Sequence, residues 1–192
     1  MDTQPNRVLS LFSGIGGMDM GFDGTVVVHQ DSIKESRYIR RKLENGFVEL
    51  EPHPFRLVFQ NDILEGAMEV YRLNHPQSSS NYHTTSIYDL LKSDFVFPEA
   101  DVILGGFPCQ DFSHCGKRGG FHSHKSHNLT DQVNQDGENS RGTLYRCFVD
   151  VVARVHPKIF VAENVYGLLT MRGDPIQQII QDFTEVGYDV SY

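Results

Sequence analysis

The protein has 192 residues, 39% of them hydrophobic, which is enough for one globular domain with a buried core. The formal net charge of −8 argues against a large nucleic-acid surface on this chain alone. No apolar run approaches the roughly 20 residues of a membrane helix, and three cysteines without a signal peptide suggest a reducing cytoplasm rather than a disulfide framework.

Short apolar runs alternate with helical patterns along the chain. We expect strands at residues 7–12, 57–59, 100–104, 158–162 and 188–192. Apolar residues at helical spacing predict helices that begin at Met18 and that cover residues 64–73, 144–155 and 175–183. This alternation predicts an α/β fold with a doubly wound, mostly parallel sheet.

Two polar segments interrupt the alternation. Residues 23–56 are charged, and their simplest interpretation is a solvated insertion. Residues 113–141 are polar and directly follow the segment that contains Cys109. A loop of that length in a compact domain is usually functional or disordered. We therefore expect a single domain over residues 1–192 in which 113–141 is a mobile loop at an active site.

Three expected strands end in residues that are typical of a ligand or catalytic site. The first is followed by Ser13-Gly14-Ile15-Gly16-Gly17, where glycines let the backbone approach a ligand. The strand at 100–104 is followed by Gly106-Phe107-Pro108-Cys109-Gln110, and the strand at 158–162 by Glu163-Asn164. In a parallel α/β sheet, ligands bind at the carboxyl ends of the strands. We expect all three motifs at that one edge.

In this order, the motifs resemble those of the DNA cytosine-5 methyltransferases, which use S-adenosylmethionine. The resemblance rests on residues 11–17, 106–110 and 163–165, with Gly116-Lys117 and residues 140–145 as further elements. It covers nearly the whole chain. It implies a Rossmann-like S-adenosylmethionine-dependent methyltransferase fold and an enzyme that methylates C5 of cytosine in DNA, in a bacterial restriction-modification setting and with S-adenosylhomocysteine as the other product.

The resemblance also implies roles for individual residues. Cys109 would add as a thiolate to C6 of a cytosine flipped out of double-stranded DNA, so that C5 can take the methyl group. Glu163 would hydrogen-bond N3 and the 4-amino group of the base. The expected supports of the catalytic loop are Gln110, Asn164 and Arg141. Cys115 and Cys147 are expected to be ordinary thiols.

A cofactor pocket follows from the same resemblance. A carboxylate after the second strand should bind the ribose hydroxyls, and of Asp31 and Asp62 we favour Asp62, because residues 67–74 resemble the family's helix at this place. Ser86 stands where the family usually carries an aspartate for the adenine amino group. The expected cofactor-binding residues are Phe12, Gly14, Ile15, Gly17, Asp62, Ile63, Ser86, Ile87, Pro108 and Leu144.

The family pattern continues past residue 192 with a Gln-x-Arg-x-Arg motif, a target-recognition domain and a final cofactor-contacting helix. We therefore expect an incomplete catalytic domain that is inactive alone and needs a C-terminal region or a second chain as partner. Three alternatives stay open: methylation of cytosine in RNA, a binding shell without activity, and a zinc site. Zinc would need Cys109, Cys115 and the histidines at 122–127, whose spacing matches no common pattern, so no metal is expected.

Overall fold

The computed structural model describes residues 4–22, 26–76, 78–108, 144–171 and 173–192. Its centre is a five-stranded sheet in the order β6-β5-β1-β7-β8, in which every neighbouring pair is parallel. The strands are β1 (Asn6–Leu11), β5 (Phe55–Asn61), β6 (Tyr82–His83), β7 (Val102–Gly105) and β8 (Ile159–Ala162). Strand order reverses between β1 and β7, which confirms the predicted doubly wound sheet.

β1 is the central strand, and it is covered on both faces. Leu9 lies beside Phe59 of β5 and Ile103 of β7, in the larger apolar cluster. Val8, which points to the opposite face, lies beside Val102 in a smaller cluster. A parallel strand buried on both faces is apolar on both faces, and this is why residues 8–11, apolar except for Ser10, show no alternation of apolar and polar residues.

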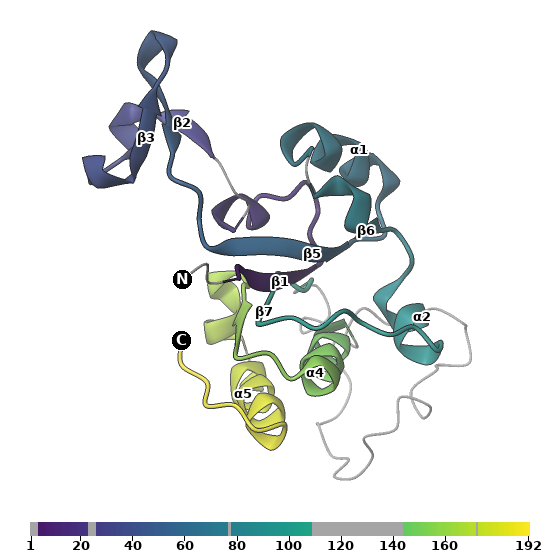
Figure 1. The fold of residues 1–192 in the computed structure, drawn as a ribbon. Coiled ribbons are helices and arrows are strands. Elements are labelled where there is room, and N and C mark those ends of the chain that lie inside the picture. Colours follow the sequence, from purple (N-terminus) through teal and green to yellow (C-terminus); the bar gives the residue numbers. More distant parts are fainter. Residues whose placement is uncertain (1–3, 23–25, 77, 109–143, 172) are drawn as a thin grey trace.

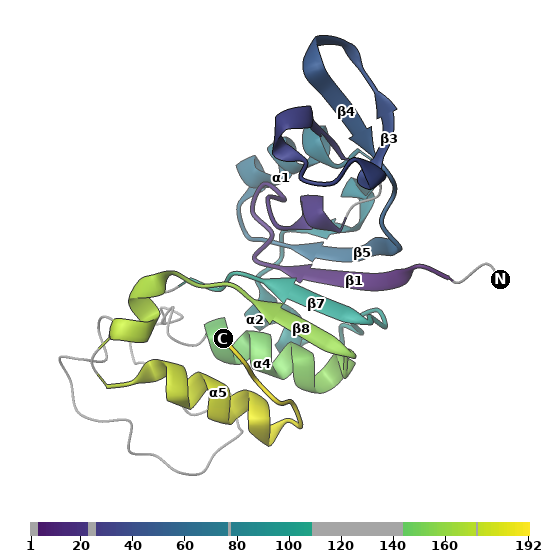
Figure 2. The ribbon, with the colours of Figure 1, turned by 90° about the vertical axis from the view of Figure 1, so that its left-hand side faces the viewer.

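Helices cover the two faces of the sheet unequally (Figures 1 and 2). On one face α2 (Ile87–Lys92), α4 (Leu144–Val155) and α5 (Pro175–Glu185) form the larger apolar cluster with the sheet. The other face carries α1 (Glu65–Asn74) and the short 3-10 turn Asp19–Gly21. None of the helices in these described ranges is long and apolar enough to cross a membrane.

A second, antiparallel sheet lies between β1 and β5 in sequence and projects away from the central sheet (Figure 1). Its order is β2-β4-β3, formed by β2 (Val27–His29), β4 (Phe47–Leu50) and β3 (Ile39–Lys42). Its charges are partly paired, since Glu49 binds both Arg40 and Arg41. The segment expected to be a solvated insertion thus has its own strands, and its last two residues, Phe55 and Arg56, begin β5.

Two predicted elements differ from the structure. The helix expected from Met18 is a three-residue 3-10 turn, Asp19–Gly21, within the described residues. The strand expected at 188–192 is wrong, because this segment has no strand assignment. Its apolar alternation instead reflects packing: Tyr188 and Val190 contact the larger cluster, and the Tyr188 hydroxyl donates to the Pro157 carbonyl at 2.7 Å.

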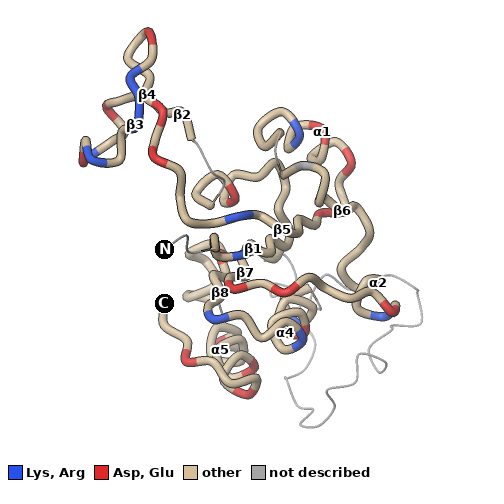
Figure 3. The backbone as a smooth tube through the Cα atoms, in the orientation of Figure 1, with Lys and Arg blue, Asp and Glu red and all other residues tan. Residues whose placement is uncertain are grey.

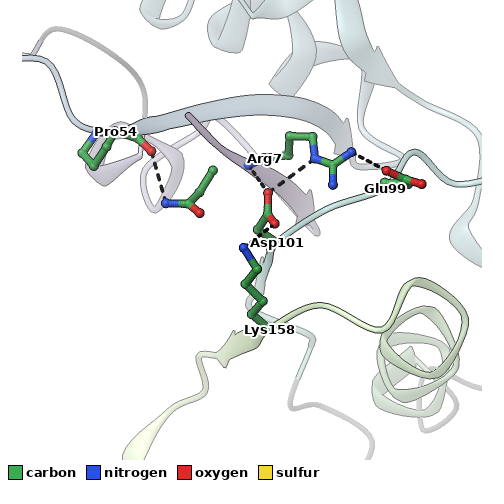
Figure 4. Close-up of polar contacts among 6 residues, drawn as sticks. Arg7, Pro54, Glu99, Asp101 and Lys158 are labelled. Atoms are coloured by element: carbon green, nitrogen blue, oxygen red, sulfur yellow. Dashed lines mark hydrogen bonds and ion pairs between the residues drawn. The ribbon is translucent and has the colours of Figure 1, made fainter. Parts of the chain in front are cut away.

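The amino edge of the sheet is held by one carboxylate (Figure 4). Asp101, directly before β7, accepts hydrogen bonds from the backbone N–H of Arg7 at 2.8 Å and from Lys158 Nζ at 3.0 Å. Arg7 belongs to β1 and Lys158 precedes β8, so the side chain links three neighbouring strands. These bonds, the Arg7 backbone bond first, lower the pKa of Asp101 to about 2.

This cluster predicts an acid-sensitive contribution to stability. Because the pKa of Asp101 is lower in the folded protein than its usual 3.8, its ionised form stabilises the fold above that pH. The contribution is lost as the pH falls through about 2. Asp101→Asn should lower the free energy of unfolding at pH 7 and flatten its pH dependence between these limits, as measured by urea unfolding.

Glu99→Gln is the control, because Glu99 also binds Arg7 but its side chain is 85% exposed. Its free energy of unfolding should change little. An equal loss in the two variants would contradict the linking role of Asp101.

Candidate active site

The described parts of the three sequence motifs lie at the carboxyl edge of the central sheet. The glycine turn follows β1, Pro108 closely follows β7, and Glu163 follows β8. This edge is where the strand order reverses and where ligands bind in such sheets. The predicted site residues and loop that lie outside the described residues are Cys109, Gln110, Arg141 and 113–141.

The glycine turn is a compact bend closed by its own backbone. Gly16 N–H donates to the Ser13 carbonyl at 2.9 Å, and Ser13 N–H donates to the Asn61 carbonyl of β5 at 3.0 Å. Three residues of the bend have left-handed backbone angles: Phe12 (φ 54°), Gly14 (φ 52°) and Gly16 (φ 86°). A bulky residue such as Phe12 is rarely found there, and such backbone strain clusters at functional sites.

The glycines of the turn face two different environments. A Cβ atom added at Gly14 or Gly17 would meet nothing within 4 Å, so this side of the turn is open to a ligand. A Cβ atom at Gly16 would overlap the ring of His75 and lie 2.8 Å from Cε2 of Tyr71. Gly16 is therefore needed for close packing against α1, a role that the sequence did not reveal.

Asp62 is joined directly to the turn. It follows β5, and its carboxylate accepts hydrogen bonds from Gly14 N–H and from Leu64 N–H, both at 3.0 Å. A carboxylate has about four acceptor positions, so two remain for a ligand. The alternative carboxylate, Asp31, lies in a 3-10 turn after β2 of the second sheet and is paired with His29. The placement supports Asp62.

The other expected cofactor residues differ in what they offer. Ile15, within the turn, and Ile63, which follows Asp62, are 52% and 64% exposed, so they offer apolar surface at this edge. Ile87 is 2% exposed and belongs to the apolar core. The partly buried ones are Phe12, Ser86, Pro108 and Leu144.

Glu163 and Asn164 are fastened to the segment that leads to Cys109. Glu163 N–H donates to the Gly105 carbonyl at 2.9 Å, and a Cβ atom at Gly106 would lie 2.9 Å from Glu163 Oε2. The carboxylate therefore lies close over the Gly106 backbone, and a larger side chain there would displace it. Asn164 Nδ2 donates to the Phe107 carbonyl at 3.0 Å, which supports a holding role for this amide.

A buried polar group next to the turn was missed by the sequence analysis. Asp19, 1% exposed, accepts hydrogen bonds from the hydroxyls of Ser10 at 2.6 Å and of Tyr71 at 2.8 Å. The available signals were Ser10, a polar residue inside an apolar strand, and Asp19, an acid between the apolar Met18 and Met20. Neither signal identifies the partner on α1.

Within the described residues, the remaining thiol and the possible metal ligands give no second site. Burial raises the pKa of the Cys147 thiol to about 12, as expected for an unreactive core cysteine. In the part of the chain that the structure describes, no three His, Cys, Asp or Glu residues are grouped to hold a metal. Cys115 and the histidines of the zinc alternative lie outside that part, so this alternative is untested.

Comparison with known proteins gives a consistent set of relatives. The family model described as C-5 cytosine-specific DNA methylase matches residues 6–192. The Type II methyltransferase M.BsuRI of Bacillus subtilis is 34% identical over 99% of this chain and 39% of its own length. M.NgoFVII of Neisseria gonorrhoeae is 36% identical over 96% of this chain and 37% of its own length. The chain thus spans about two fifths of these relatives.

The packing of Gly16 predicts a specific sensitivity. Gly16→Ala should lower the free energy of unfolding by about 2–4 kcal/mol, because the added methyl group overlaps His75 and the backbone angle is left-handed. Gly17→Ala is the matched control, since its methyl group enters open space. Urea unfolding of both variants tests this, and similar losses would show that the contact with α1 is not the cause.

Proposed function

The chain belongs to the C-5 cytosine-specific DNA methylase family. We propose that the protein of which it forms part transfers a methyl group from S-adenosylmethionine to C5 of cytosine in double-stranded DNA. The observation that carries the proposal is the juxtaposition at one sheet edge of a ligand-open glycine turn, joined to Asp62, and of Glu163 beside the segment leading to Cys109. A related protein of Aeropyrum pernix, M.ApeKI, is named a DNA (cytosine-5-)-methyltransferase.

The described residues fit an S-adenosylmethionine site. Gly14 and Gly17 leave room for a ligand to approach the backbone of the turn. Asp62 keeps acceptor positions for ribose hydroxyls, and the exposed Ile15 and Ile63 offer apolar surface to an adenine ring. When bound, the cofactor supplies an electrophilic methyl group on a sulfonium.

The chain's own residues would activate the cytosine. Cys109, as a thiolate, adds to C6, and the electron pair of the C5–C6 bond makes C5 nucleophilic. Glu163 binds the base edge: one oxygen accepts from the 4-amino group, and the other, when protonated, donates to N3 and stabilises the charge that develops there. After C5 has taken the methyl group, its proton passes to solvent and Cys109 leaves C6 as a thiolate.

Sequence-specific contacts with DNA are assigned to other parts of the protein. Acidic and basic positions are interspersed over the described chain (Figure 3), and the whole sequence carries a net charge of −8. Lys and Arg clusters provide most of the affinity for the phosphate backbone. We place target recognition in the portion of the relatives that this chain does not span, or in a second chain. A bacterial cytoplasm in a restriction-modification setting would keep Cys109 reduced.

The covalent step predicts a trapped complex. With S-adenosylmethionine present, and with a C-terminal region or second chain that supplies target recognition, the protein should form a stable adduct with mixed-sequence duplex DNA containing 5-fluorocytosine, because fluorine at C5 cannot leave as the proton does. This chain alone should form little or no adduct. Denaturing gels would detect the adduct. Cys109→Ser should form none, and Glu163→Gln should lower methyl transfer about 100-fold or more.

The same gel separates the alternatives. An adduct with 5-fluorocytosine RNA but not with DNA would replace the proposed substrate. No adduct and no methyl transfer with either nucleic acid, in a protein that binds S-adenosylhomocysteine, would favour a binding shell without activity.

The proposed cofactor site predicts that removing Asp62 weakens cofactor binding, whereas removing Asp31 does not. Asp62→Ala should weaken binding of S-adenosylhomocysteine about tenfold or more, because it removes ribose acceptors and the bond to Gly14. Asp31→Ala should leave the affinity unchanged. Isothermal titration calorimetry gives both dissociation constants, and equal affinities would remove Asp62 from the site.

A further inference from the structure

A chain of hydroxyl groups leads from the glycine turn into the interior, to a single buried carboxylate. Ser13 Oγ lies 2.9 Å from Ser10 Oγ, to which it donates, and Ser10 Oγ donates to Asp19 Oδ1 at 2.6 Å. From the other side Tyr71 Oη, on α1, donates to Asp19 Oδ2 at 2.8 Å. Ser10, Asp19 and Tyr71 are each at most 1% exposed.

The direction of these hydrogen bonds identifies Asp19 as the common acceptor. Both oxygens of a carboxylate can accept hydrogen bonds, and here each of them receives a hydroxyl proton. Such a buried group is stable only while its partners stay in place, so it holds the turn and α1 in one arrangement.

Aromatic rings add a second set of contacts behind the turn. The Tyr71 ring stacks on His75 with centroids 4.4 Å apart and meets Tyr82 edge-on at 4.8 Å. His75 Nε2 lies 3.0 Å from the Gly16 carbonyl, and Tyr82 Oη donates to the Gly14 carbonyl at 2.9 Å. Two carbonyls of the turn are thus held from the protein side, while its other side stays open.

We propose that Asp19 and Tyr71 are positioning residues for the cofactor, acting through the glycine turn. They fix the backbone that carries Gly14 and Gly17 before the ligand arrives, and a preformed site binds more tightly because less ordering is required on binding. This inference rests on the proposed function, since it takes the open side of the turn as the cofactor site.

The test compares two variants, each of which loses one tyrosine hydroxyl. Tyr71→Phe removes the bond to Asp19 but keeps the ring on His75. Tyr188→Phe is the control, because it removes a 2.7 Å bond to the Pro157 carbonyl, outside the turn and α1. Tyr71→Phe should weaken binding of S-adenosylhomocysteine about tenfold in calorimetry, whereas the control should leave it unchanged.

Two further measurements separate positioning from general stability. Hydrogen exchange of the backbone amides at residues 13–20 in the ligand-free protein should be faster in Tyr71→Phe and unchanged in Tyr188→Phe. Urea unfolding gives the free energy of each variant. Asp19→Asn replaces one carboxylate oxygen, which accepts a hydrogen bond from a hydroxyl, with an amide nitrogen that can only donate. It should weaken binding of S-adenosylhomocysteine and speed amide exchange, as Tyr71→Phe does.

The outcomes distinguish this inference from the proposed function. Unchanged affinity in both Tyr71→Phe and Asp19→Asn, with unchanged exchange, would overturn the positioning role even if both variants were less stable. If the unmodified protein neither binds S-adenosylhomocysteine nor transfers methyl groups, the proposed function fails. The exchange rates then decide whether Asp19 and Tyr71 hold the turn in place, and rates equal to those of the control would overturn that role as well.

Discussion

The parallel pairing of β1 with β5 on one side and β7 on the other is the constraint on which the rest of the structure depends. Leu9 lies between Phe59 and Ile103, so any shift of β1 would disturb the apolar cores of both neighbours. Because the strands run in one direction, their carboxyl ends meet at one edge. The glycine turn, Asp62 and Glu163 are brought to that edge by the pairing alone.

The polar groups at the two edges of the sheet have different roles. At the amino edge Asp101 joins three strands through Arg7 and Lys158, and these interactions stabilise the fold. At the carboxyl edge the polar groups are arranged around backbone that stays open, as at Gly14 and Gly17. A strained Phe12 and close glycine contacts are tolerated there because the core beneath the edge is tightly packed.

The glycine turn shows how one short motif meets two demands. Its outer side is left open at Gly14 and Gly17, as the proposed cofactor site requires, whereas Gly16 needs to be glycine so that α1 can approach. The buried Asp19 connects these demands, since it bonds both to Ser10 beneath the turn and to Tyr71 of the helix. Under the proposed function, affinity for the cofactor and packing of the protein interior are therefore coupled at this point.

The sequence by itself determined the strand–helix alternation and the motifs at strand ends, because periodicity and glycine turns are local properties. It did not show that residues 27–50 form a separate sheet or that residues 188–192 pack without pairing, since strand pairing depends on which edges are free. Only the tertiary structure placed Asp62, and not Asp31, against the turn. Likewise, only the tertiary structure showed that Asp19 bonds to Tyr71, 52 positions away, because a contact between distant residues produces no periodic pattern in the sequence.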